Sequence, residues 1–181
     1  MKRNLITAAI AVVMFTLVLG LAYPLVVTGV AQVAFGDNAD GNPNLIAKDT
    51  KGNARYFQPR PSQTDYNAKG TFFSNRGPNS STARYFYRDQ LAAYLALNGQ
   101  YNPGLTNAKV PADAVTTSGS GVDPHISEDN AAIQARRVAA VRGIPLAQVD
   151  DLVEQATDGR FLGIFGEPGV NTTKLKEALD R

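Results

Sequence analysis

Residues 5–35 read LITAAIAVVMFTLVLGLAYPLVVTGVAQVAF, and no charged side chain occurs between Arg3 and Asp37. The hydrocarbon core of a bilayer is about 30 Å thick and a helix rises about 1.5 Å per residue, so about 20 apolar residues cross it. The run is longer than this minimum. We therefore predict one transmembrane helix over residues 5–35, after a short basic segment over residues 1–4.

A cleaved signal peptide is the alternative interpretation of this N-terminus. Signal peptides combine a basic start with an apolar core of roughly 7–15 residues, which is much shorter than the run seen here. Gly29-Val30-Ala31 is compatible with cleavage after small residues, so processing stays open, although we favour an uncleaved anchor. The chain has no cysteine, which excludes both a lipoprotein anchor and a disulfide framework.

The charges beside the span predict its orientation. Lys2 and Arg3 precede it, and basic flanks remain in the cytoplasm by the positive-inside rule. With one span, the rest of the chain lies outside the cytoplasm. We thus expect a single-pass membrane protein with a cytoplasmic N-terminus and an extracytoplasmic domain. In a bacterium this means the cell (inner) membrane and a periplasmic domain.

Small and polar residues recur at intervals of four within the span. They are Thr16, Gly20, Pro24, Thr28 and Gln32. Residues four apart lie along one side of a helix, and small or hydroxyl residues there let another helix approach closely. Pro24 removes a backbone hydrogen bond near Gly20 and predicts a kink. We interpret the series as a partner-facing ridge, although glycine and proline are common in such helices anyway.

The rest of the chain predicts a linker over 36–44 and one compact mixed α/β (α+β) domain over 45–181. Once Lys2 and Arg3 are set aside, the 18 basic side chains fall to 16 and equal the acidic ones, so the domain offers nucleic acid no basic footprint. The first predicted elements are paired strands at 45–47 and 54–57, a loop over 58–82 and a helix over 85–98. A second helix is capped by Ser127 and ended by Gly143, and a third follows Pro145 with Leu146, Val149, Leu152 and Val153 on one face. A strand over 161–165 and a helix capped by Asn171 complete the domain.

One segment, Ser118-Gly-Ser-Gly-Val-Asp-Pro-His-Ile-Ser127, gathers residue types that carry chemistry. It lacks the Gly-x-Ser-x-Gly spacing of a hydrolase elbow. It also lacks the paired ligands of a typical zinc site, so we expect no catalytic and no metal site. Its glycine-rich turn could hold an anion through backbone amides, yet the chain contains no phosphate-binding Gly-x-x-x-x-Gly-Lys-[Ser/Thr] motif. We favour a structural turn.

Four segments resemble the signature sequences of a known family. They are YFQPRPS at 56–62, SNRGP at 74–78, VPADAVTTSGSGVDPHIS at 110–127 and GEPGVN at 166–171. In this order they resemble the C subunit (KdpC) family of the bacterial Kdp potassium-transporting P-type ATPases, over the whole chain including the span. Residues 79–109 depart from the family pattern.

The resemblance implies an accessory, non-catalytic subunit of the high-affinity potassium uptake complex. The implied partners are a potassium-channel-like subunit, a P-type ATPase subunit that carries the catalytic aspartate, and a small single-span peptide, all within the lipid bilayer. ATP and potassium are then handled by the complex, and no cofactor is assigned to this chain. The resemblance also implies a catalytic chaperone that raises the ATP affinity of the ATPase subunit. The nucleotide-binding residues so implied are Ser118, Gly119, Ser120, Gly121, Asp123 and His125.

The predicted topology favours a stabilising role, because an outer domain cannot touch cytosolic ATP. Tyr56, Phe57 and Arg60 are candidate interface residues, since aromatic residues and arginine anchor many interfaces. An internal ion pair is the alternative for Arg60. The alternative for the whole chain is an independent membrane-anchored enzyme or binding module.

Overall fold

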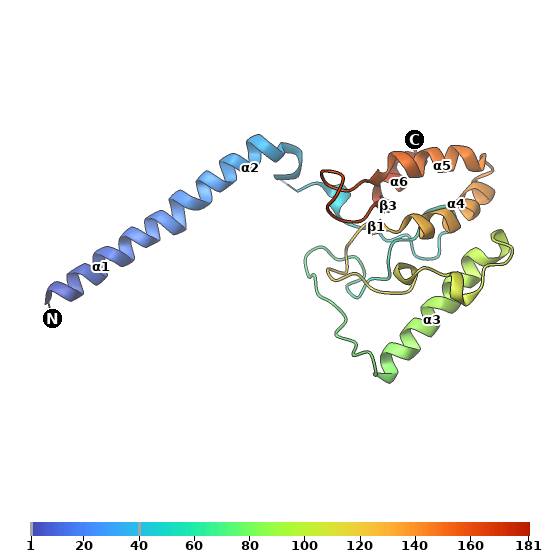
Figure 1. Ribbon diagram of the computed structural model, residues 1–181, viewed down its shortest axis with the longest axis horizontal. Helices are drawn as coiled ribbons and strands as arrows, with labels where there is room; N and C mark the ends of the chain where they lie inside the picture. Colours follow the sequence, from blue (N-terminus) through green and yellow to red (C-terminus); the bar gives the residue numbers. More distant parts are fainter. Residues whose placement is uncertain (1, 40) are drawn as a thin grey trace. The chain divides into compact units, whose positions relative to one another are not determined.

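The computed structural model describes residues 2–39 and 41–181, with side chains left undescribed at 37–39. Met1 and Asp40, which belong to the predicted segments 1–4 and 36–44, lie outside the described residues. The chain divides into two units, Met1–Pro43 and Asn44–Arg181 (Figure 1).

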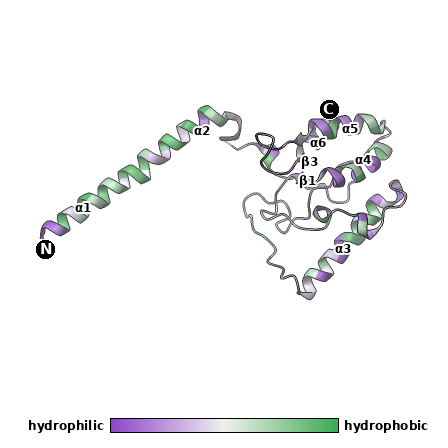
Figure 2. Ribbon diagram, viewed as in Figure 1, coloured by the Kyte–Doolittle hydropathy of each residue, from purple (hydrophilic) through white to green (hydrophobic). Residues whose placement is uncertain are grey.

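The N-terminal unit is one long apolar helix. It consists of α1 (Lys2–Leu17), a π-helical segment (Val18–Ala22) and α2 (Tyr23–Ala39). Within the described residues, Lys2–Gly36 is the one helix that is long and apolar enough to cross a membrane. Figure 2 shows apolar residues along nearly its whole length. The prediction of a single long apolar helix at this end is confirmed.

The π-helical segment lies just before Pro24, where the sequence predicts a kink. The Tyr23 N–H donates to the Val18 carbonyl, five residues back instead of four. Proline has no N–H, and its ring would clash with the carbonyl four residues earlier in a regular helix. A wider turn relieves that clash, so the disruption near Gly20 takes this form. A second interruption, at Phe35 (φ −136°, ψ 31°), falls where the apolar run ends.

The C-terminal unit is an α+β domain, as the sequence predicts. Its helices are α3 (Ser81–Asn98), α4 (Glu128–Arg142), α5 (Leu146–Gln155) and α6 (Thr172–Leu179). Its strands β1 (His125–Ile126), β2 (Thr157–Asp158) and β3 (Gly169–Asn171) form an antiparallel sheet in the order β1-β3-β2. His125 pairs with Asn171, and Asp158 pairs with Gly169. Short 3₁₀ turns connect the rest.

The predicted helix boundaries hold where capping residues mark them. The Ser127 hydroxyl accepts a hydrogen bond from the Asn130 N–H, and Gly143 ends α4 with a φ of 69°. The Asn171 side chain accepts from the N–H groups of Thr173 and Lys174. These caps satisfy backbone groups that a helix end leaves free. Helix α3 begins at Ser81, four residues before the predicted start.

The core of the domain lies between the sheet and the C-terminal helices. Its buried apolar residues are Phe57, Ile126, Ala131, Ala135, Val138, Ala139, Val149, Ala156, Val170 and Leu175. Val149, Leu152 and Val153 of the predicted α5 face pack here as expected. Leu146, at the start of the same helix, is exposed instead. The core thus fixes β1 and β3, which carry the site described below.

Three predicted strands are wrong. Residues 43–57 are all described by the structure and contain no strand. Pro43–Leu45 form a 3₁₀ turn, and the Ala47 N–H donates to the Val122 carbonyl. Residues 54–57 find their partners among side chains of α4, as described below. The apolar run 161–165 is a tight loop in which Phe161 pairs with Phe165.

Candidate functional site

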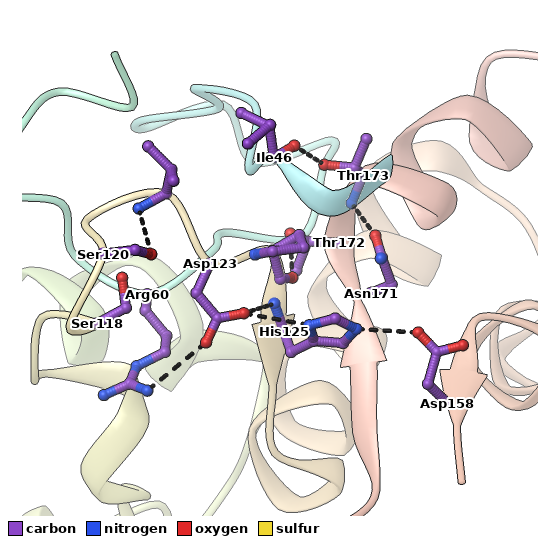
Figure 3. A network of polar contacts seen from close by, with 12 residues as sticks. Ile46, Arg60, Ser118, Ser120, Asp123, His125, Asp158, Asn171, Thr172 and Thr173 are labelled. Carbon is purple, nitrogen blue, oxygen red and sulfur yellow. Dashed lines mark hydrogen bonds and ion pairs between the residues drawn. The ribbon is translucent and has the colours of Figure 1, made fainter. Parts of the chain in front are cut away.

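The single histidine of the chain lies between two carboxylates contributed by different parts of the sequence (Figure 3). The His125 Nδ1 atom is 3.1 Å from Asp123 Oδ1, and its Nε2 atom is 2.9 Å from Asp158 Oδ2. The Lys174 ammonium donates to the other Asp158 oxygen at 2.7 Å. The sequence points to Asp123 and His125 but not to Asp158 and Lys174, because the fold brings these two to the site from distant parts of the chain.

Gly169 makes the contact between His125 and Asp158 possible. His125 lies on β1 and Asp158 on β2, with β3 between them. A Cβ atom at Gly169 would approach His125 Cβ to 3.2 Å and Cδ2 to 3.3 Å. The absence of a side chain therefore lets the imidazole ring cross the central strand.

The two carboxylates favour the protonated imidazole. The hydrogen bond to Asp123 raises the pKa of His125 above its ordinary value, partial burial opposes this, and the bond to Asp158 adds to it. Partial burial would raise the pKa of each carboxyl, but the hydrogen bonds from His125 to Asp123, and from Lys174 and His125 to Asp158, outweigh it and lower both pKa values. The cluster is a mutually stabilised charge network.

Arg60 joins the same cluster from the segment 54–62. Its guanidinium lies 3.9 Å from Asp123 Oδ2 and donates to the Thr117 carbonyl at 3.1 Å and the Thr116 hydroxyl at 3.3 Å. The internal ion pair that the sequence left open for Arg60 is present. Arg60 therefore fastens its segment to the stretch that precedes Ser118.

The serine hydroxyls of the predicted nucleotide segment are bonded to their own backbone. Ser118 Oγ accepts from the Gly121 N–H at 3.0 Å, and Ser120 Oγ accepts from the Val122 N–H at 3.2 Å. Ser118 is buried, while Gly119 and Ser120 are exposed. This is the geometry of a closed structural turn, since two backbone donors that could bind an anion already have partners.

The end of that turn is packed too closely for any side chain. Gly121 has a φ of 76°, and a Cβ atom there would lie 2.8 Å from the Thr64 hydroxyl oxygen. The Gly121 carbonyl accepts from Ser62 at 2.6 Å and from Thr64 at 3.3 Å. Glycine is required here both by conformation and by space.

The other two interface candidates are also engaged within the domain. Phe57 is 1% exposed and belongs to the core, which contradicts its prediction as an interface residue. The Tyr56 ring lies between Arg142 and Lys176, 4.8 Å and 4.6 Å from its centroid, and its hydroxyl donates to Asp180 at 2.6 Å.

Helix α4 carries a buried polar network that the sequence did not predict. Arg137 is 0% exposed and donates to the carbonyls of Ala54 and Tyr56 and to Asn98 Oδ1. Burial lowers the pKa of Arg137 to about 10. Gln134, one turn away, bonds both backbone groups of Gln58. The signal in the sequence was a pair of long polar residues on the helix face that also carries Ala131, Ala135 and Val138.

A sizeable cavity lies away from the predicted nucleotide segment. It has a volume of about 640 Å³ and lies between α3 and the segment 58–66, with Pro59, Pro61, Tyr66, Phe86 and Leu97 in its lining. None of the predicted nucleotide residues lines it. In the part of the chain that the structure describes, no group of three His, Asp or Glu side chains is arranged to hold a metal ion.

Comparison with known proteins identifies the relatives of the chain. The family model described as "KdpC: K+-transporting ATPase, c chain" matches residues 5–181. The chain belongs to the KdpC family. The potassium-transporting ATPase KdpC subunit of Mycobacterium tuberculosis is 42% identical over 192 residues, covering 100% of both chains. That of Rhodospirillum rubrum is 44% identical, covering 99% of this chain and 96% of its own. That of a Caulobacter species is 42% identical, with 99% and 94% covered.

Membership of the KdpC family confirms the resemblance seen in the four sequence segments. Several residues of the site come from those segments. Arg60 comes from the first, Asp123 and His125 come from the third, and Gly169 comes from the fourth. These segments therefore supply Arg60, Asp123 and His125 to the charge network and form the closed turn beside it, whereas Asp158 and Lys174 lie outside them.

Proposed function

We propose that the chain is a non-catalytic, membrane-anchored subunit of a potassium-transporting ATPase complex, and that its domain serves assembly and stability. The observation that carries this proposal is the closed state of the 118–127 segment. Its serine hydroxyls and its Asp123 and His125 side chains are all bonded within the chain. Groups committed to internal bonds hold a shape, whereas a catalytic nucleophile or base has to face a substrate.

We assign the domain to the outer face of the membrane. Lys2 and Arg3 favour a cytoplasmic N-terminus, and one span then carries residues 44–181 across. The partners in this arrangement are a potassium-channel-like subunit, a P-type ATPase subunit and a small single-span peptide. The lipid bilayer covers the rest of the exposed apolar helix.

The ridge on the span is the part of the anchor that we expect to meet a partner helix. Thr16 and Gly20 line a shallow apolar surface of the N-terminal helix together with Ala11, Val12 and Phe15. A Cβ atom at Gly20 would have only Thr16 within 4 Å, at 4.0 Å, so the helix itself leaves this position open. Close packing at such small residues is a common way for membrane helices to associate.

The chaperone role implied by the resemblance requires a nucleotide site. Two features weigh against such a site at 118–125: the occupied N–H groups of Gly121 and Val122, and the predicted outer location. We therefore propose that this segment supports the domain fold. A titration of the full chain in detergent with ATP should show no saturation up to millimolar concentration. Saturable binding that Ser120→Ala abolishes would instead favour the nucleotide role.

The assembly role is tested by purifying the tagged full-length chain in mild detergent. We expect larger membrane subunits and potassium-stimulated ATPase activity in the eluate. A chain that elutes alone, from membranes that retain such activity, would favour an independent module. For the ridge, Gly20→Leu should lower the yield of partner subunits several-fold. Gly29→Leu, which introduces the same side chain outside the four-residue series, is the matched control.

A further inference from the structure

The loop between β2 and β3 presents a group of exposed apolar side chains. Phe161, Leu162 and Ile164 are 71%, 74% and 70% exposed, and Phe165 is also exposed. Large apolar residues gathered in this way on a folded domain mark a contact site. We propose that the loop Phe161–Phe165 inserts into an apolar recess of another subunit of the complex. This inference rests on the assembly role proposed above.

The loop holds a defined shape. Phe161 N–H donates to the Phe165 carbonyl at 2.8 Å, and Phe165 N–H donates back to Phe161 at 3.0 Å. Its ends continue into β2 and β3, and β3 is fixed in the core by the fully buried Val170. A preorganised apolar tip loses little conformational entropy when it binds, which favours a specific protein recess.

The backbone at the tip is strained. Leu162 has a φ of 54°, in the left-handed region that a residue with a side chain seldom adopts. Gly163 follows with a φ of 77°. The conformation of Leu162 is strained because the residue has a side chain, whereas glycine adopts a positive φ readily. Strained residues of this kind tend to occur at binding sites. Here the strain holds the side chains of Leu162 and Ile164 outward on the same short loop.

Charge favours a protein partner over the lipid surface. Arg160 and Glu167 close the base of the loop through an ion pair of 2.6 Å, and the residues between them carry no charge. The nearby Lys174 is paired with Asp158. Segments that bind lipid headgroups use unpaired lysine and arginine beside their apolar residues. An uncharged apolar tip matches an uncharged recess better than an anionic surface.

A photo-crosslinking experiment identifies the occupant directly. The full-length chain carries p-benzoylphenylalanine in place of Ile164, or in place of the similarly exposed Phe73 as the control. After irradiation in native membranes, we expect a covalent adduct with a larger membrane subunit at position 164, at least five-fold stronger than at position 73. Lipid adducts alone, or no adduct at position 164, would overturn the docking proposal.

Two further measurements keep this inference separate from the assembly role. The unsubstituted chain is purified in parallel. If no partner subunit co-purifies with it, both the assembly role and the docking proposal are contradicted. If it does carry partners, the double variant Phe161→Ser, Ile164→Ser should retain at least five-fold less of them, while Phe73→Ser retains the normal amount. Unchanged retention in the double variant would contradict the docking alone.

Discussion

Gln134 bonds the backbone of Gln58 as a neighbouring β-strand would. Its Oε1 atom accepts from the Gln58 N–H at 2.7 Å, and its Nε2 atom donates to the Gln58 carbonyl at 3.1 Å. A side chain of α4 thus replaces a ladder partner for a segment 76 residues away. This is how an extended segment without a paired strand keeps its backbone polar groups satisfied.

Replacing Gln134 by leucine should therefore destabilise the domain by about 2–4 kcal/mol, because two backbone groups would lose their partners. Urea denaturation followed by circular dichroism measures the change in the free energy of unfolding. Gln148→Leu, at an exposed position of α5, should change it by less than about 0.5 kcal/mol. Equal effects of the two variants would show that the Gln58 contact contributes little.

Arg137→Lys should lower the free energy of unfolding by about 3 kcal/mol or more, although the substitution is conservative in charge. A lysine has one donor group and cannot reach Ala54, Tyr56 and Asn98 together. The neighbouring Arg136 is exposed, so Arg136→Lys is the matched control and should be nearly neutral. The same denaturation experiment compares them, and a neutral Arg137→Lys would contradict the proposed role.

The charge network predicts a pH-dependent contribution to stability. The raised pKa of His125 gives stability that is complete below about pH 6.5 and is lost as the pH rises through the folded-state value. The lowered carboxyl pKa values give stability present above about pH 3.9 and lost as the pH falls. The stability difference between the natural chain and His125→Gln should be greatest between these limits.

We expect that difference to stay below about 1 kcal/mol, because the groups are partly exposed and screened. It should shrink as the pH rises from about 6.5 through the raised pKa of His125 and the imidazole loses its proton. Urea midpoints measured across this range test the prediction, with Asp89→Asn as a variant of an ordinary surface pair. A difference that stays constant with pH would show that His125 is not charged in the network.

Gly169→Ala should disturb the same network without touching a charged residue. The new methyl group would press on the imidazole and lengthen the bond from His125 Nε2 to Asp158. The pKa of His125 should then fall toward its ordinary value, and an NMR titration follows it easily because the chain has one histidine. Gly159→Ala, where a Cβ atom meets nothing within 4 Å, should leave the pKa unchanged. A similar pKa in both variants would exclude the proposed function of Gly169.

Local signals in the sequence predicted the parts of the fold that depend on neighbouring residues. The apolar span and the caps at Ser127, Gly143 and Asn171 involve contacts within a few residues, and each was found where predicted. The same reasoning failed for residues 54–57. Their β-forming side chains suggested a strand, but the decisive contacts come from Arg137, about 80 residues later.

The candidate site was predictable only in part for the same reason. Asp123 and His125 are neighbours in one conspicuous motif, so the sequence pointed to both. Asp158 and Lys174 stand in unremarkable surroundings. Antiparallel pairing on both sides of β3 brings Asp158 to His125, and Lys174, on α6, bonds Asp158. The role of Gly169 depends on the strand order, which places β3 between the strands of His125 and Asp158, so the sequence alone could not predict it.

The wide turn before Pro24 changes the path that the four-residue series follows along the span. An α-helix completes a turn in about 3.6 residues, so a series with an interval of four winds around its axis by about 40° at each step. The π-helical segment Val18–Ala22 places an extra residue in one turn. This extra residue reverses part of the drift around the helix axis in the middle of the series. Gly20 and Thr28 consequently stay closer to a common side, and a straight neighbouring helix could follow them without coiling around the anchor.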